Sequence, residues 1–148
     1  MRERLLRQFG PASLGLFVVL ALAVQGCFSV RLVSPYDDQT DQAVTGLYRN
    51  IMAYMADLRS KPQVTGPDSV SRAQKYEAIR LDIGVMKLRV SAKEKNQQQI
   101  EQVNLLADNW VTVGKLEKTN PPPEAIENAR SGMETMLTAI LKLEEAKK

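Results

Sequence analysis

Between residues 34 and 148, apolar side chains recur at alternating intervals of three and four residues, in four separate runs. This spacing places the apolar side chains on one face of an α-helix, whereas a half-buried strand would show strict alternation. Each run therefore predicts an amphipathic helix, and no stretch of this region has a convincing strand pattern. The four runs are Val44, Tyr48, Ile51, Met55 and Leu58; Tyr76, Ile79, Ile83, Met86 and Val90; Ile100, Val103, Leu106, Trp110 and Val113; and Ile126, Ala129, Met133, Met136, Ile140 and Leu143.

Proline and glycine mark two of the three boundaries between these helices. Residues 60–67 carry two prolines and a glycine, and residues 119–123 end in three consecutive prolines. Both segments are typical of loops, and serine, aspartate or proline is favoured where a helix begins. We expect the first helix to begin within Ser34–Asp37, with Ser34 as cap and Pro35 in the first helical position. We expect Asp68 or Ser69 to cap the second helix, and Pro123 to begin the fourth.

The boundary between the second and third helices has no such marker. A continued helix would place Lys93 and Gln97 in the core, which is unfavourable for an unpaired lysine. We therefore expect a turn near residues 91–96, with the polar run 93–99 as solvated surface; the alternative is one helix over residues 70–117, about 72 Å long. With that turn, the sequence predicts an all-α domain over residues 34–148, an antiparallel up-down four-helix bundle.

The N-terminus has the pattern of an export signal. Three arginines in the first seven residues precede an uncharged apolar stretch at residues 12–24. Thirteen helical residues rise about 20 Å, which is short of the roughly 30 Å hydrocarbon core of a bilayer. A basic start followed by a short apolar core is typical of a secretory signal peptide, and its length disfavours the alternative of a permanent membrane span.

Two cleavage sites compete at the end of this segment. Residues 21–23 (Ala-Leu-Ala) fit the small-residue rule of the ordinary signal peptidase. Residues 24–27 (Val-Gln-Gly-Cys) resemble the bacterial lipobox, and ordinary cleavage would leave the only cysteine of the chain as an unexplained free thiol. The lipobox resemblance implies cleavage after Gly26, a diacylglyceryl group on the Cys27 sulfur and a further acyl chain, such as palmitate, on the new amino group. We therefore expect a lipoprotein signal peptide over 1–26, a lipidated tether over 27–33 and the helical domain over 34–148.

The anchor predicts a location. Two or three acyl chains hold a protein firmly to a bilayer, whereas one chain holds it marginally. Phe28 follows the cysteine, and by analogy with lipoproteins of enteric bacteria the lack of aspartate there implies the outer membrane, facing the periplasm. The six residues after Cys27 reach at most about 20 Å, so the helical domain is expected to stay close to that membrane.

Composition removes several classes of function. The chain has no histidine and one cysteine, so it can form neither a Cys/His zinc site nor a Ser–His or Cys–His catalytic pair. The net charge is +3, but Arg2, Arg4 and Arg7 against Glu3 account for +2 of it, which leaves +1 for residues 27–148 and no basic face for nucleic acid. No catalytic, cofactor-binding or metal-binding residue is expected.

Several residue types have a structural and a functional interpretation. Methionines could form a thioether copper site, but their helical spacing favours the core, as it does for the tyrosines and Trp110. Acids at positions 37, 38 and 41 could bind calcium, but the calcium-loop pattern is missing and negative charge is favourable where a helix begins. Each expected helix contains a glycine, which favours close helix contact over space for a ligand. The methionines are Met52, Met55, Met86, Met133 and Met136, and the glycines are Gly46, Gly84, Gly114 and Gly132.

These observations predict a non-enzymatic, lipid-anchored envelope protein that binds or scaffolds an unknown protein partner in the periplasm. The alternative is a small-molecule or lipid carrier with a pocket between the helices, near the glycines.

Two segments carry a family resemblance. Residues 31–45 (RLVSPYDDQTDQAVT) and 138–148 (TAILKLEEAKK) resemble parts of an uncharacterised family of small bacterial lipoproteins. The resemblance implies the lipid anchor and implies no activity.

Overall fold

A computed structural model describes residues 34–148, so the predictions that concern the signal peptide, Cys27 and the tether lie outside the described residues. The described chain forms four long helices and contains no strand. This confirms the predicted all-α fold. The helices are α2 (Asp38–Ser60), α3 (Pro67–Ser91), α4 (Gln97–Glu117) and α5 (Pro123–Glu145).

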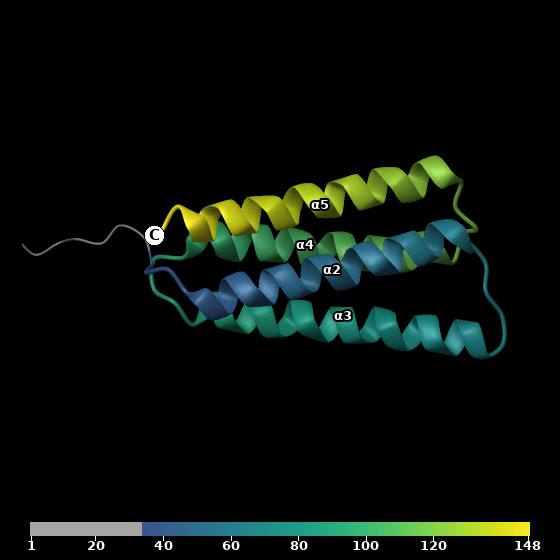
Figure 1. Ribbon diagram of the computed structural model, residues 1–148, viewed down its shortest axis with the longest axis horizontal. Coiled ribbons are helices and arrows are strands. Elements are labelled where there is room, and N and C mark those ends of the chain that lie inside the picture. The colour runs from purple at the N-terminus through teal and green to yellow at the C-terminus, as the bar shows by residue number, and fades with distance from the viewer. Residues whose placement is uncertain (1–33) are drawn as a thin grey trace, which may run out of the picture. The chain divides into compact units, whose positions relative to one another are not determined.

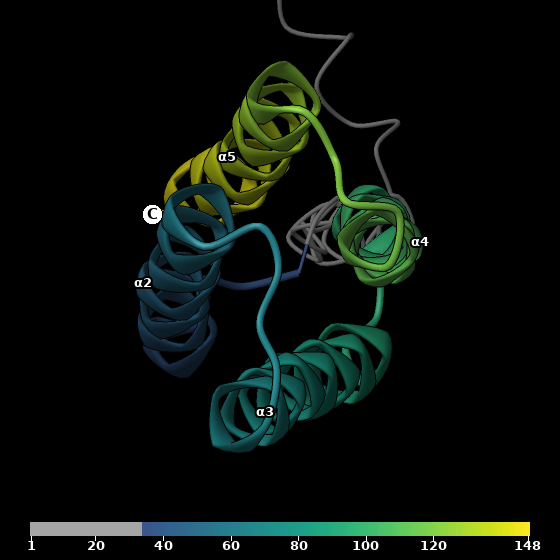
Figure 2. The same cartoon turned by 90° about the vertical axis from the view of Figure 1, so that its right-hand side faces the viewer.

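The helices run up and down in an antiparallel bundle (Figure 1). Viewed along the bundle, they form a ring in which α2 packs on α3 and α5, and α4 packs on the same two helices (Figure 2). We call one end of the bundle the entry end: it holds the start of α2, the α3–α4 turn and the C-terminus. We call the other the loop end: it holds the α2–α3 and α4–α5 connections.

The four apolar runs meet in one core. Fifteen of their twenty-one residues are fully buried, and the others are partly buried. Three fully buried apolar residues fall outside the predicted runs, namely Leu47, Tyr54 and Leu137. A helix in a globular bundle buries a stripe wider than the strict three-four spacing, which is why that spacing missed them.

The predicted start of the first helix is wrong by a few residues. The N-cap of α2 is Asp37, whose side-chain oxygen accepts a hydrogen bond from the Gln39 N–H at 3.1 Å. Ser34 is buried instead of capping, and its hydroxyl donates to Asn96 Oδ1 at 3.0 Å. Aspartate is at least as good a cap as serine, so the serine is available for a contact with a distant segment.

The start of the second helix also differs. α3 begins at Pro67 with Gly66 as N-cap and without a side-chain cap, so the expected cap at Asp68 or Ser69 is wrong. Gly66 has φ +58°, a left-handed conformation that favours glycine. Proline suits the first helical position because its missing N–H would have no partner in the helix. The same preference is confirmed for the fourth helix, where α5 starts at Pro123.

The turn expected near residues 91–96 is confirmed, since α3 ends at Ser91 and α4 begins at Gln97. The chain reverses direction at Lys95, which has φ +57°, and the turn contains neither glycine nor proline. The expectation that residues 93–99 form solvated surface is wrong at two positions, because Asn96 and Gln99 are buried. They point into the entry end and not outward.

Candidate functional site

The entry end contains a buried carboxylate. Glu144, near the end of α5, is fully buried. It accepts hydrogen bonds from Gln99 Nε2 at 2.8 Å, from Lys147 Nζ at 2.9 Å and from the backbone N–H of Asp37. A buried charge costs several kcal/mol unless it is paired and hydrogen-bonded, and Glu144 is both.

The partners of Glu144 are themselves bound to one another. Lys147 Nζ also donates to Gln99 Oε1 at 2.8 Å and to Asn96 Oδ1 at 3.0 Å. Asn96 in turn donates to the Val90 carbonyl at 2.8 Å and accepts from Ser34. This entry-end network joins the start of the described chain, the α3–α4 turn and the C-terminus. Within residues 34–148, no buried side-chain nitrogen or oxygen of this network lacks a hydrogen-bond partner, which favours a structural role.

An ion pair extends the network to the start of α2. Lys93 Nζ lies 2.7 Å from Asp37 Oδ2, and the Thr40 hydroxyl donates to the same carboxylate at 2.6 Å. Burial disfavours ionisation of Asp37, but the bonds from Lys93, Thr40 and the Gln39 N–H outweigh it and lower the pKa of Asp37 to about 2. Burial likewise opposes ionisation of Glu144, while Lys147 and Gln99 bring its pKa below the ordinary value.

The loop-end half of the bundle contains an aromatic cluster. Trp110 stacks on Tyr76 with the ring centroids 5.0 Å apart, and Tyr54 meets the edge of Trp110 at 5.0 Å. Trp110 Nε1 donates to the Tyr76 carbonyl and the Tyr76 hydroxyl donates to the Trp110 carbonyl, each at 3.2 Å. These paired bonds fix α3 against α4.

Gly114 makes room for this cluster. A Cβ atom at Gly114 would lie 2.6 Å from the Tyr76 hydroxyl oxygen, closer than carbon and oxygen can approach. Close helix contact is therefore confirmed for this glycine. It is wrong for Gly46, Gly84 and Gly132, where an added Cβ would meet nothing within 4 Å.

Arg72 is the buried cation beside the aromatic cluster, and its side chain is 2% exposed. Nε donates to Asp57 Oδ2 at 3.0 Å, and Nη2 reaches the Asp57 carbonyl at 3.4 Å. Among residues 34–148, Nη1 has no hydrogen-bond acceptor, and the Glu117 carboxylate is 3.8 Å away. Glu117 itself accepts from the Tyr54 hydroxyl at 2.6 Å; burial, and then this bond, raise the pKa of Tyr54.

A groove opens next to Arg72, between α3 and α4 and beside the α2–α3 connection. Its volume is about 700 Å³, within the range of small-molecule sites. Its walls include Tyr76, Val111 and Gly114, and Lys115 and Lys118 are among its charged residues. The groove thus combines apolar walls with a buried guanidinium, and sequence reasoning missed it because its residues come from three separate segments.

The outer face of α3 carries a second set of apolar residues. Leu81, Val85 and Leu88 are 60%, 58% and 74% exposed. Successive helical residues are about 100° apart, so Leu81 and Val85 both lie on the opposite side of α3 from the core residue Ile83. We call these three residues the α3 outer stripe. They also follow a four-three spacing, a signal that could have been recognised in the sequence.

The methionines and acids that the sequence offered as functional candidates lie where they stabilise the fold. Met55, Met86 and Met133 are core residues, and Met52 and Met136 pack against the core. The acids at 37, 38 and 41 lie at the start of α2, as expected of charges near a helix N-terminus. Over residues 34–148, no three His, Cys, Asp or Glu side chains gather as metal ligands would, and no helix is long and apolar enough to cross a bilayer.

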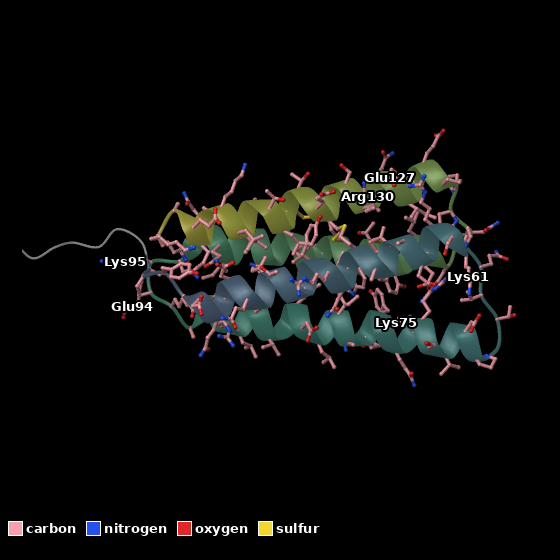
Figure 3. All side chains as sticks on the ribbon, viewed as in Figure 1. Lys61, Lys75, Glu94, Lys95, Glu127 and Arg130 are labelled. Atoms are coloured by element: carbon pink, nitrogen blue, oxygen red, sulfur yellow. The ribbon has the colours of Figure 1, made fainter. Side chains whose placement is uncertain are left out.

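Charged side chains such as Glu127 and Arg130 project from the surface of the bundle (Figure 3). On α5, Glu127 and Arg130 form an ion pair at 2.6 Å with both side chains more than a third exposed. Such a pair is screened by solvent and contributes little to stability, in contrast to the entry-end network.

Comparisons of the chain with protein-family models, with curated proteins and with solved structures found no match.

Proposed function

We propose that the protein is a non-enzymatic, lipid-anchored component of the bacterial envelope that binds a protein partner through the α3 outer stripe. The observation that carries the proposal is the exposure of Leu81, Val85 and Leu88 on a helix whose opposite face is fully buried. An exposed group of large apolar side chains on a small domain is typical of an interaction site. The bundle does not need these residues for its own core.

The charges beside the stripe favour a partner of a particular kind. Arg80, Lys87 and Arg89 outnumber the acids Glu77 and Asp82, and Glu77 is already paired with Arg80 at 2.6 Å. Complementary charge orients partners and selects among them. The partner surface we propose is an apolar helix or groove bordered by carboxylates, on another envelope protein.

The anchor places the stripe in the compartment of that partner. Lipidation at Cys27 would hold the domain beside the outer membrane, on its periplasmic side, within about 20 Å of its attachment point. Replacing the sulfur tests this directly: Cys27→Ser is expected to move the protein from the membrane fraction to the soluble fraction or to block its maturation. Unchanged membrane fractionation of this variant, together with an unmodified mature mass of the parent protein, would contradict the anchor.

A photo-crosslinking experiment in intact cells tests the partner. A benzoylphenylalanine residue replaces Val85, and a matched residue replaces Asn128, which is exposed on α5. We expect a discrete crosslinked protein from position 85 alone, joined to a peptide with both apolar residues and carboxylates. Leu88→Glu should abolish the crosslink, because it adds a charge that an acidic border repels.

Three outcomes would contradict the proposed partner. They are crosslinks from position 85 only to lipid, crosslinks only to a second copy of this chain, and a crosslinking pattern shared with position 128.

A further inference from the structure

The α3–α4 groove is separate from the α3 outer stripe and lies beside the C-terminal end of α4. We propose that this groove binds a small apolar molecule with a single carboxylate. The carboxylate lies against Lys115 and Lys118, and the apolar part lies against Tyr76 and Val111. The site does not depend on the proposed envelope partner or on the lipid anchor.

Two lysines of the groove have no counter-charge. Lys115 and Lys118 line the groove and are exposed, so a ligand can reach both, unlike the buried Arg72. Within residues 34–148, neither lysine side chain forms an ion pair or a hydrogen bond. They are three residues apart at the end of α4, so they lie on the same side of the helix. A lysine near the C-terminus of a helix is favourable even without a ligand, and these two indicate a site only together with the cavity beside them.

The other charged residues of the groove are already paired. Glu77 forms an ion pair with Arg80 at 2.6 Å, and Arg72 lies 3.0 Å from Asp57 and 3.8 Å from Glu117. With the two lysines, these groups comprise four cations and three carboxylates, which leaves a net charge of +1. One carboxylate on the ligand would neutralise this charge. A second negative charge would exceed it, and a positive ligand would be repelled by the lysines.

The walls define the rest of the ligand. Val64, Tyr76 and Val111 provide apolar surface, and Val111 is 46% exposed. Gly114 adds no side chain of its own to the wall. The part of α3 that lines the groove, residues 69–77, is about 12 Å long, and the volume of about 700 Å³ is typical of a small-molecule site. A ring or a short branched chain a few bonds from its carboxylate fits these dimensions.

Trp110 provides a direct readout. It is the only tryptophan in the chain, and it stacks on Tyr76, which lines the groove. The full chain, purified from its host membrane and placed in phosphatidylcholine vesicles, would be titrated with phenylpropanoate while Trp110 emission is followed. The uncharged phenylpropanamide and the cationic phenylpropylamine are the matched probes. A further titration uses acetyl-leucyl-leucine, which carries its carboxylate on a peptide.

A pair of double variants tests the charges. Lys115→Gln with Lys118→Gln removes both cations of the groove, and Lys87→Gln with Lys142→Gln removes two exposed lysines outside it. Because exposed ion pairs are partly screened by solvent, we expect the groove variant to weaken phenylpropanoate binding by about threefold to tenfold. The control should leave it unchanged, and neither variant should alter binding of the amide. High salt should reduce the preference for the acid over the amide.

A second pair of variants tests the cavity. Ala73→Phe fills the groove from an exposed position of α3, and Ala56→Phe makes the same change at an exposed position of α2 outside the groove. Because the filled groove loses its apolar contacts with the ligand, we expect Ala73→Phe to weaken phenylpropanoate binding by about tenfold or more. Ala56→Phe should leave it unchanged.

Each result decides the proposal. Saturable binding of phenylpropanoate that is tighter than that of the amide, and that only the groove variants weaken, would support the site. The proposal is overturned if phenylpropanoate does not bind, if the amide or the amine binds as tightly, or if the groove variants behave like their controls. Tighter binding of acetyl-leucyl-leucine than of phenylpropanoate would also overturn it, because the groove would then recognise a peptide C-terminus.

Discussion

The two ends of the bundle both bury charged side chains, but they differ in how fully those side chains are hydrogen-bonded. At the entry end, Glu144 and Lys147 are bonded to each other and to two buried amide side chains, and the network is closed. At the loop end, one nitrogen of Arg72 has no hydrogen-bond acceptor within the part of the chain that the structure describes, and Arg72 also lines a groove. A fully satisfied polar network stabilises and specifies a structure, whereas a buried polar group without a partner lowers stability.

The largest expected effect concerns the closed end. Glu144→Ala should lower the free energy of unfolding by about 3–5 kcal/mol, because it leaves a buried lysine without its counter-charge. Urea denaturation measures the loss. The matched variant Glu127→Ala removes one member of an exposed ion pair on the same helix and should change little. Equal effects of the two substitutions would remove the distinction between a structural network and a surface pair.

The next effect tests the packing of the loop end. Gly114→Ala places a Cβ against the Tyr76 ring, so we expect it to destabilise the bundle by about 1–3 kcal/mol. Gly132→Ala enters open space within a helix and should stabilise by about 0.5–1 kcal/mol. Thermal unfolding of both variants checks the opposite signs. A stabilising Gly114→Ala would mean that Tyr76 does not occupy this position against α4.

Acid should act on the entry end, with a smaller loss of stability. The pKa of Asp37 in the folded protein is about 2, below its ordinary value of 3.8, so its contribution is present above about pH 4 and is lost as the pH falls toward 2. The Thr40 and Asp41 amides donate to the Asp37 carbonyl, and their protection against hydrogen exchange, corrected for the intrinsic pH dependence of exchange, should fall in this range. Asp37→Asn keeps a capping side chain but removes the titrating charge, and should flatten the dependence. A variant with the parent's pH profile would exclude Asp37 as the cause.

The smallest expected effect falls on the α3 outer stripe. Leu88→Ser should change the free energy of unfolding by no more than about 0.5 kcal/mol, because the side chain is 74% exposed and packs in no core. The same substitution should reduce the crosslink at position 85. A large loss of stability would show that Leu88 stabilises the fold. That result would contradict the proposal that the stripe is a binding surface.

The fold could be predicted because its signal is local. The spacing of apolar residues such as Ile79, Ile83 and Met86 encodes a helical face within a few turns, and prolines mark two of the loops. The turn at residues 91–96 followed from the cost of burying Lys93. The exact caps were less accessible, since both Asp37 and Ser34 can cap and only the tertiary contact of Ser34 decides between them.

The sites could not be predicted in the same way, because their partners are distant in sequence. Gln99 belongs to a run of polar residues that resembles solvated surface, and only the fold brings it to Glu144. Arg72 and Gly114 lie on different helices, and no local pattern joins them at one groove. The α3 outer stripe differs, because its spacing is a local pattern in the sequence. It was overlooked because the apolar run on the opposite face of the same helix is stronger.

The attachment at Cys27 is the claim on which the location, the compartment and the proposed partner depend. The most direct test is the intact mass of the protein isolated from its native host. We expect a chain that begins at Cys27 and is heavier by a diacylglyceryl group, with or without a further acyl chain. A chain that keeps residues 1–26, or one that carries an unmodified Cys27 thiol, would contradict it.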